Sequence, residues 1–236
     1  MSKQKRKIIS TALSLIALFA GIYAGTVAVW TYSVTPLAIT EAKSRGLFQL
    51  DSFPTEAIDI LLAVEDPSFY QHNGVDFFTP GQGKTTISQS VAKMIYLSDA
   101  HLNGIQGILQ GMFKKVWETV PALDLGRDLM AVVLNLRVDK NTQLQIFLRN
   151  VYMGNYEGQE IYGFDVAAQM YYHKKVAEMS QDEIIALVAM IKAPNKYHPL
   201  DSKQFHTQRV RRIQRLLRKE CKPNGVFDAD LNGCAS

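Results

Sequence analysis

Charged residues are absent from one long stretch near the start of the chain. No Asp, Glu, Lys or Arg occurs from Ile8 to Thr40, and residues 8–30 read IISTALSLIALFAGIYAGTVAVW. About 20 apolar residues suffice to cross the hydrocarbon core of a bilayer. Trp30 and Tyr32 stand where aromatic side chains are typical of the membrane interface. The pattern predicts a transmembrane helix over 8–32. A cleaved signal peptide is the alternative, although no small-x-small cleavage site follows.

Beyond this stretch most of the chain has helical spacing. Residues 33–52 are predicted to form an extended connector, with a short strand possible near Gly46–Leu50. The apolar residues of 55–66 then recur on one face of a helix, which Pro67 ends because a residue before proline avoids the α region. Ser180 and Glu183 form a capping box. Further helices are predicted over 85–96, 128–136, 142–152, 164–172, 184–192 and 204–219. The fold class is therefore mainly α.

Residues 102–117, LNGIQGILQGMFKKVW, combine apolar side chains with glycines at 104, 107 and 111. The run is too short to span a bilayer and too apolar for a free loop, and its glycines make it a poor helix former. We expect it to lie in the membrane interface, with its apolar side chains in the headgroup boundary and Lys114 and Lys115 at lipid phosphates. Packing into the domain core is the alternative.

Charge and cysteine content limit the classes of function. The formal net charge is +4, and the first seven residues carry four of the positive charges, so the remaining residues balance to zero. This argues against a nucleic-acid-binding domain, and it predicts a cytoplasmic N-terminus with the rest of the chain on the far side of the membrane. Two cysteines, Cys221 and Cys234, exclude a four-cysteine zinc site. They could form a disulfide in an oxidising compartment or remain separate thiols.

One carboxylate stands out as a candidate for chemistry. Glu65 ends an apolar helix and is followed by the aromatic residues Phe69 and Tyr70. Partial burial raises the pKa of a carboxyl group and makes it a better base near neutral pH. A surface carboxylate at a helix end is the plainer interpretation. The basic helix at 204–219 could bind anionic lipid, or it could be a solvated helix packed through its apolar residues.

Several motifs occur in order over about residues 57–200. They are EDPSFYQHNGVD from Glu65, GKTTISQSVAK from Gly83, FLRNVYMG from Phe147, YGFDVAAQ from Tyr162 and LVAMIKAPNKYHP from Leu187. Together they resemble the signatures of the peptidoglycan glycosyltransferases, glycosyltransferase family 51. The resemblance implies a monofunctional, membrane-anchored enzyme, because too few residues follow 200 for a penicillin-binding domain.

The resemblance implies an organisation and a reaction. A cytoplasmic tail (1–7), the transmembrane helix (8–32) and the connector (33–52) would precede a glycosyltransferase domain (53–220) and a C-terminal tail (221–236). The domain would have a lysozyme-like α-helical head and a small membrane-proximal jaw. It would polymerise lipid II into glycan strands in the inner membrane, with its catalytic domain on the periplasmic side. The implied partners are lipid II, the growing strand, the membrane and other cell-wall synthesis proteins.

The resemblance also assigns roles to residues. Glu65 would be the general base on the acceptor hydroxyl, and undecaprenyl diphosphate would leave with inversion. A second acid, Glu118 or Asp128, would lie on the leaving-group side, with or without a divalent cation (Mg²⁺ or Mn²⁺). Glu118 is preferred for its KKVWE context, and Asp128 is the alternative that counting back from Phe147 gives. The expected substrate- and diphosphate-binding residues are Asp66, Phe69, His72, Lys84, Thr85, Thr86, Gln89, Lys93, Lys114 and Lys115.

The chain departs from the family pattern in three places. Only six residues separate Asp76 from Gly83, Lys84 and Ser90 replace a Gly and a Gln, and the second acid is displaced. Two alternatives stay open, and the departures motivate the first of them. One is a catalytically weak scaffold that binds cell-wall precursors or proteins. The other is a lytic glycan hydrolase with a lysozyme-like acid.

Overall fold

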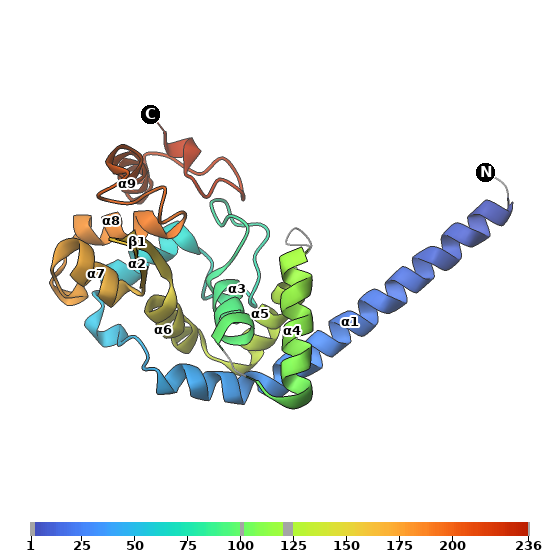
Figure 1. Cartoon of the computed structure of the whole chain (residues 1–236). Helices are drawn as coiled ribbons and strands as arrows, with labels where there is room; N and C mark the ends of the chain where they lie inside the picture. Colours follow the sequence, from blue (N-terminus) through green and yellow to red (C-terminus); the bar gives the residue numbers. More distant parts are fainter. Residues whose placement is uncertain (1–2, 100–101, 120–124, 236) are drawn as a thin grey trace.

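The computed structural model describes residues 3–99, 102–119 and 125–235, and Figure 1 shows a mainly helical domain with one projecting N-terminal helix. The predicted fold class is confirmed. In chain order the elements are α1 (Lys3–Ser44), η1 (Leu50–Ser52), α2 (Thr55–Glu65), α3 (Ile87–Ala92), the π-helix η2 (Lys93–Asp99), α4 (Gly104–Thr119), α5 (Leu125–Arg137), α6 (Lys140–Asn150), β1 (Tyr152–Tyr156), β2 (Gln159–Tyr162), α7 (Phe164–Tyr172), η4 (Val176–Glu178), α8 (Gln181–Ile191), α9 (Lys203–Leu217) and η5 (Asn232–Cys234).

Helix α1 has an exposed half and a half that belongs to the domain. Its apolar N-terminal part projects from the domain, and its C-terminal part runs along it (Figure 1). Among the described helices it alone is long and apolar enough to cross a membrane, and only 6% of its most apolar 18-residue window is buried. This helix fits a membrane anchor.

The expectation of an extended connector over 33–52 is wrong for residues 33–44, which continue α1. The apolar face of this part is buried, with Val34 0% and Ala38 2% exposed, and the Thr35 and Tyr96 hydroxyls are hydrogen-bonded at 2.7 Å. Tertiary packing thus extends the helix past the apolar stretch, even across Pro36. No strand forms near Gly46–Leu50, within the described part of the chain.

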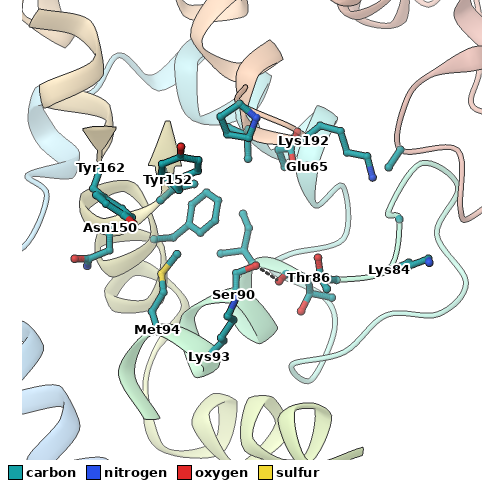
Figure 2. A pocket seen from close by; sticks show the side chains of 18 of the residues that line it. Glu65, Lys84, Thr86, Ser90, Lys93, Met94, Asn150, Tyr152, Tyr162 and Lys192 are labelled. Atoms are coloured by element: carbon teal, nitrogen blue, oxygen red, sulfur yellow. Dashed lines mark hydrogen bonds between the residues drawn. The ribbon is translucent and has the colours of Figure 1, made fainter. Parts of the chain in front are cut away.

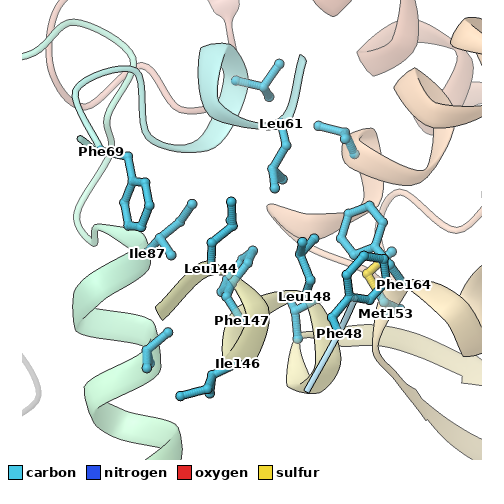
Figure 3. Packing of buried hydrophobic residues seen from close by; sticks show 14 of the residues in the cluster. Phe48, Leu61, Phe69, Ile87, Leu144, Ile146, Phe147, Leu148, Met153 and Phe164 are labelled. Carbon is cyan, nitrogen blue, oxygen red and sulfur yellow. The ribbon is translucent and has the colours of Figure 1, made fainter. Parts of the chain in front are cut away.

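The core of the domain joins helices that are distant in sequence. Figure 3 shows Leu61 of α2, Leu144 and Leu148 of α6 and Phe164 of α7 gathered in one cluster, and each of them is 0% exposed. Complete burial of such a side chain contributes about 1.5–3 kcal/mol. This packing fixes the C-terminal end of α2, where Glu65 lies.

Residues 104–119 form helix α4, so the expectation that this run is poorly helical is wrong. A glycine costs a helix about 1 kcal/mol relative to alanine, and packing outweighs that cost here. Phe113 is 4% exposed and contacts Trp30 edge-on, with ring centroids 5.1 Å apart. The Trp30 indole donates a hydrogen bond to the Gln106 carbonyl at 3.1 Å. One face of α4 is therefore packed against α1.

The other face of α4 is apolar and exposed. Ile105, Ile108 and Met112 are 77%, 65% and 57% exposed. The expected membrane-interface segment is thus a helix with one packed face and one free apolar face, and its lipid contact stays a prediction.

We expect the Ile105→Ser, Ile108→Ser, Met112→Ser variant to bind anionic vesicles about tenfold or more weakly, because its apolar contact with the acyl boundary is lost. Vesicle sedimentation measures this, on protein lacking residues 1–20 so that α1 does not dominate. A deletion through residue 35 would also remove the buried Trp30. Leu200→Ser, Phe205→Ser is the control, since both residues are exposed elsewhere. Unfolding of the triple variant would show a core role instead, and unchanged binding would exclude an interfacial α4.

The segment that follows α6 is a β-hairpin. Strands β1 and β2 pair antiparallel, with Tyr152 opposite Tyr162 and Tyr156 opposite Gln159. Glu157 and Gly158 at the turn both have positive φ, 51° and 83°, as a type I′ hairpin turn requires. The hairpin also shortens the predicted helix over 142–152, because α6 ends at Asn150.

The C-terminal segment folds back onto the domain. We call residues 221–235 the C-terminal cap; the disulfide Cys221–Cys234 closes it, which resolves the open choice between a disulfide and free thiols. Its backbone pairs with the loop before α3, because the Gly81 and Gly83 amides donate to the Gly225 and Val226 carbonyls at 3.0 and 2.7 Å. The cap therefore holds the end of the short loop between Asp76 and Gly83.

Candidate functional site

A cavity of about 730 Å³ opens between the end of α2, α3, the start of β1 and the end of α8. Figure 2 shows Glu65 and Lys192 together at one side of it, Tyr152 and Tyr162 at another, and Lys84 near the loop before α3. The size suits a ligand as large as a sugar unit.

Cationic side chains dominate the charged lining of this cavity. Among the described residues that line it, Arg45, Lys84, Lys93 and Lys192 are cationic, and Glu65 is the single acid. Lys93 also lies over the Trp117 ring, 4.4 Å from its centroid, so the end of α4 supports it. Such a lining favours an anionic ligand held near one carboxylate.

Glu65 has the environment of a perturbed acid. Its side chain is 16% exposed, and its Oε1 accepts no hydrogen bond among the described residues. Burial raises the pKa of Glu65, and the charges of Arg209 and Lys192 lower it in part, while Asp66 raises it. The nearest cation is Arg209, whose Nη2 is 3.7 Å from Oε1. A carboxylate in this state can accept a proton near neutral pH.

The loop before α3 is built around a helix cap. The Thr86 hydroxyl accepts from the Gln89 amide, and the Gln89 side chain accepts from the Thr86 amide, which is a capping box. The Thr86 hydroxyl also donates to the Gly74 carbonyl at 2.7 Å. These contacts hold Lys84, Thr85 and Thr86 at the cavity wall.

Several residues expected to bind substrate lie in the interior. Asp66 is 0% and Phe69 1% exposed. The Asp66 carboxylate accepts from the Ile87 amide at 2.8 Å and from His72 Nε2 at 3.2 Å, while His72 Nδ1 accepts from the Gly74 amide. None of the three lines the cavity. Their hydrogen bonds and packing hold the loop that follows Glu65 against α3.

The two candidates for the second acid have different surroundings. Asp128, in the first turn of α5, accepts a hydrogen bond from the buried Gln89 side chain and lies 3.3 Å from an Arg127 nitrogen. Glu118 is exposed near the end of α4. Neither lines the cavity, and the same holds for Gln89, Lys114 and Lys115. The structure therefore brings Glu65, Lys84, Thr85, Thr86 and Lys93 together, out of the set that sequence predicted.

Sequence reasoning missed part of the lining. Arg45 directly follows α1, Lys192 directly follows α8, and Ala229 comes from the C-terminal cap. Lys192 directly precedes the Ala193-Pro194 helix end, a signal that could have marked it. Arg45 and Ala229 carry no local signal, because their place depends on how distant segments pack.

Among the described residues, no group of three or more His, Cys, Asp or Glu side chains is placed to hold a metal ion. Around Asp128 the donors are one carboxylate with a guanidinium beside it. This donor set does not fit a protein-built divalent site.

Comparison with known proteins agrees with this arrangement. Residues 33–218 match the family model described as Transglycosylase. The chain belongs to the transglycosylase family. The matched range begins within α1, at residue 33, and ends after α9, so the C-terminal cap lies outside it.

Transglycosylase relatives among curated proteins are longer than this chain. It is 29% identical over 191 residues to penicillin-binding protein 1B of Haemophilus influenzae, covering 75% of this chain and 22% of that protein. It is 26% identical over 200 residues to penicillin-binding protein 1B of Escherichia coli, covering 79% and 22%. It is 27% identical over 198 residues to penicillin-binding protein 1A of Aquifex aeolicus, covering 78% and 24%. The chain thus spans about a quarter of the length of these relatives.

Proposed function

We propose that this transglycosylase polymerises lipid II into peptidoglycan glycan strands. The observation that carries the proposal is the charge of the cavity, in which one partly buried acid, Glu65, shares the described lining with four cationic side chains, of which Arg45 is also paired with Glu41. Lipid II combines sugars with a diphosphate. A site with one base and several cations suits transfer of a sugar away from a diphosphate leaving group.

In the proposed reaction Glu65 takes the proton of the acceptor sugar hydroxyl. The hydroxyl oxygen then attacks the anomeric carbon of the growing chain, and the bond to undecaprenyl diphosphate breaks with inversion. Lys84 and Lys93, with the Thr85 and Thr86 hydroxyls, would stabilise the negative charge that develops on the diphosphate.

For the second acid we propose Asp128 rather than Glu118. Its hydrogen bond to Gln89 links it to the cap of α3, whose first residues line the cavity, whereas Glu118 is exposed. Asp128 would act by orienting Gln89 and the adjacent loop on the leaving-group side.

We expect Asp128→Asn to lower the polymerisation rate by about tenfold or more, because the hydrogen bond from Gln89 loses its charge assistance. Glu118→Gln should stay within about twofold of wild type, since an exposed side chain has little to lose. Initial rates with labelled lipid II measure both variants. The reverse order would give the role to Glu118, and two small effects would mean that the chain has no second acidic site.

The apolar helix α1 supports a location for the protein in the cell. We infer that α1 inserts into the inner membrane with residues 1–7 in the cytoplasm, so that the domain lies on the periplasmic side. The substrate keeps its lipid tail in the same membrane. Other cell-wall synthesis proteins are the further partners that this location suggests.

Release of undecaprenyl diphosphate from labelled lipid II tests the function. We expect release together with consumption of the monomer. A scaffold would bind lipid II and release none. A lytic hydrolase would instead cleave finished peptidoglycan, so incubation with purified peptidoglycan sacculi forms the second arm, in which we expect no soluble fragments.

A further inference from the structure

A buried arginine lies behind the proposed base. Arg209 of α9 is 1% exposed, and burying a cation is costly unless it has partners. Its Nη1 donates to the Ala229 carbonyl at 2.6 Å, and its Nη2 lies 3.7 Å from Glu65 Oε1. The guanidinium also lies 5.5 Å from the centroid of the Tyr197 ring. The cation is therefore held between the C-terminal cap and Glu65.

The contact between Arg209 and Glu65 compensates charge without occupying the carboxylate. At 3.7 Å the two groups form an ion pair that is too long for a hydrogen bond. Glu65 Oε1 consequently accepts no hydrogen bond among the described residues. Oε1 is buried on the side of Arg209, so a substrate hydroxyl would reach Glu65 at its other carboxylate oxygen, Oε2, while Arg209 compensates the charge from behind.

Two further arginines of α9 attach the cap to the same helix as Arg209. Arg212 and Arg215, one and two turns further along α9, donate to the Asp230 and Cys234 carbonyls at 2.9 Å each. The cap also contributes Ala229 to the cavity wall. The basic face of α9 is therefore a binding surface for the chain's own C-terminal segment, which the sequence analysis did not foresee.

The cap also packs closely against the loop before α3, on another side of the cavity. A Cβ atom at Gly83 would lie 2.9 Å from the Ala229 side chain, and one at Gly81 would lie 2.9 Å from Pro223. Inside the cap, the Asp228 carboxylate accepts from the Asn224, Asn232 and Gly233 amides at 2.7–2.8 Å. Together with the disulfide, these hydrogen bonds fix the conformation of the cap, which packs beside the short loop between Asp76 and Gly83.

We propose that Arg209 is a positioning residue for Glu65, and that the disulfide-closed C-terminal cap holds its guanidinium in place. The proposal deepens the proposed function and rests on it. The C-terminal cap, which lies outside the family match, would then help to position the proposed base.

The proposal predicts a direction for the pH dependence. The charged groups facing Glu65 are Arg209 from α9, Lys192 after α8 and the adjacent Asp66; Arg209 itself also faces Asp230. Burial raises the pKa of Glu65 and Arg209 lowers it. Loss of Arg209 therefore raises that pKa further, so the acid limb of kcat/KM moves to higher pH and the rate at neutral pH falls.

The test compares variants of the full-length chain in detergent. Arg209→Gln removes the charge but keeps an amide that can donate to the cap, and Arg209→Lys keeps the charge. Arg211→Gln is the matched control, because Arg211 is exposed on the same helix. Cys221→Ser, Cys234→Ser opens the cap without changing Arg209.

We expect the acid limb of Arg209→Gln to lie about one pH unit or more above that of wild type, the range for an opposite charge at this distance. Arg209→Lys should recover most of the shift, Arg211→Gln should show none, and the paired serine variant should move in the same direction as Arg209→Gln. If Arg209→Gln does not fold, the paired serine variant is measured in its place. An acid limb of kcat/KM at the wild-type pH, in whichever of these two variants is used, overturns the proposal.

A second measurement separates this proposal from the proposed function. The pKa of Glu65 is read by ¹³C NMR of labelled glutamate carboxyls, assigned by the resonance lost in Glu65→Gln. If wild type makes no polymer, the proposed function fails, and the titration still decides whether Arg209 lowers the pKa of Glu65. Equal pKa values in wild type and Arg209→Gln would reject the role of Arg209 whatever the activity.

Discussion

Replacing Glu65 with glutamine is expected to leave the protein folded and to reduce lipid II polymerisation by about 10²–10⁴-fold, the usual contribution of a general base. The amide is nearly the same size as the carboxyl group but cannot take the hydroxyl proton at neutral pH. Glu65 lies at the end of α2, and its Oε1 makes no hydrogen bond among the described residues, so few structural contacts are lost. The buried Arg209 keeps its bond to the Ala229 carbonyl.

Glu56→Gln is the matched control for this prediction. Glu56 lies in the first turn of the same helix and is exposed, so its rate should equal that of wild type. Initial rates and the thermal unfolding midpoint are measured for both variants. A Glu65→Gln protein that retains more than half of the wild-type rate would reject Glu65 as the base.

Asp66→Ala is expected to lower the free energy of unfolding by about 2–5 kcal/mol, because it leaves two buried donors without a partner. These donors are the Ile87 amide and the His72 ring, and Asp66 itself is 0% exposed. The loop that follows Glu65 would lose its attachment to α3. Denaturant unfolding in detergent, followed by circular dichroism, measures the change.

The control for Asp66→Ala is Asp59→Ala, an exposed acid on α2, the helix that Asp66 follows; this variant should change the free energy of unfolding by less than about 0.5 kcal/mol. Equal stability of the two variants, with activity lost only in Asp66→Ala, would mean that Asp66 acts on substrate as the sequence first suggested.

Local signals predicted the position of the proposed base. The apolar spacing of α2 and the proline at 67 place Glu65 at a helix end, and the helix ends there. The capping box of α8 at Ser180 was likewise readable, because a cap depends on residues three apart. The sequence-based predictions were correct where neighbouring residues determine the local structure.

Tertiary packing decided the features that sequence did not predict. Helix α4 forms despite its glycines because Phe113 packs against Trp30, and α1 continues past residue 32 because Val34 finds a buried place. Arg209 is buried only because a segment some 20 residues later folds back over α9. Propensity and periodicity carry no information about such distant partners.

The most direct test of the account is electrophoretic separation of polymer from monomer after the purified full-length protein is incubated with labelled lipid II. Wild-type protein is expected to convert the monomer into a ladder of glycan strands, while Glu65→Gln leaves it unconverted. Lipid II that stays monomeric with folded wild-type protein would contradict the account.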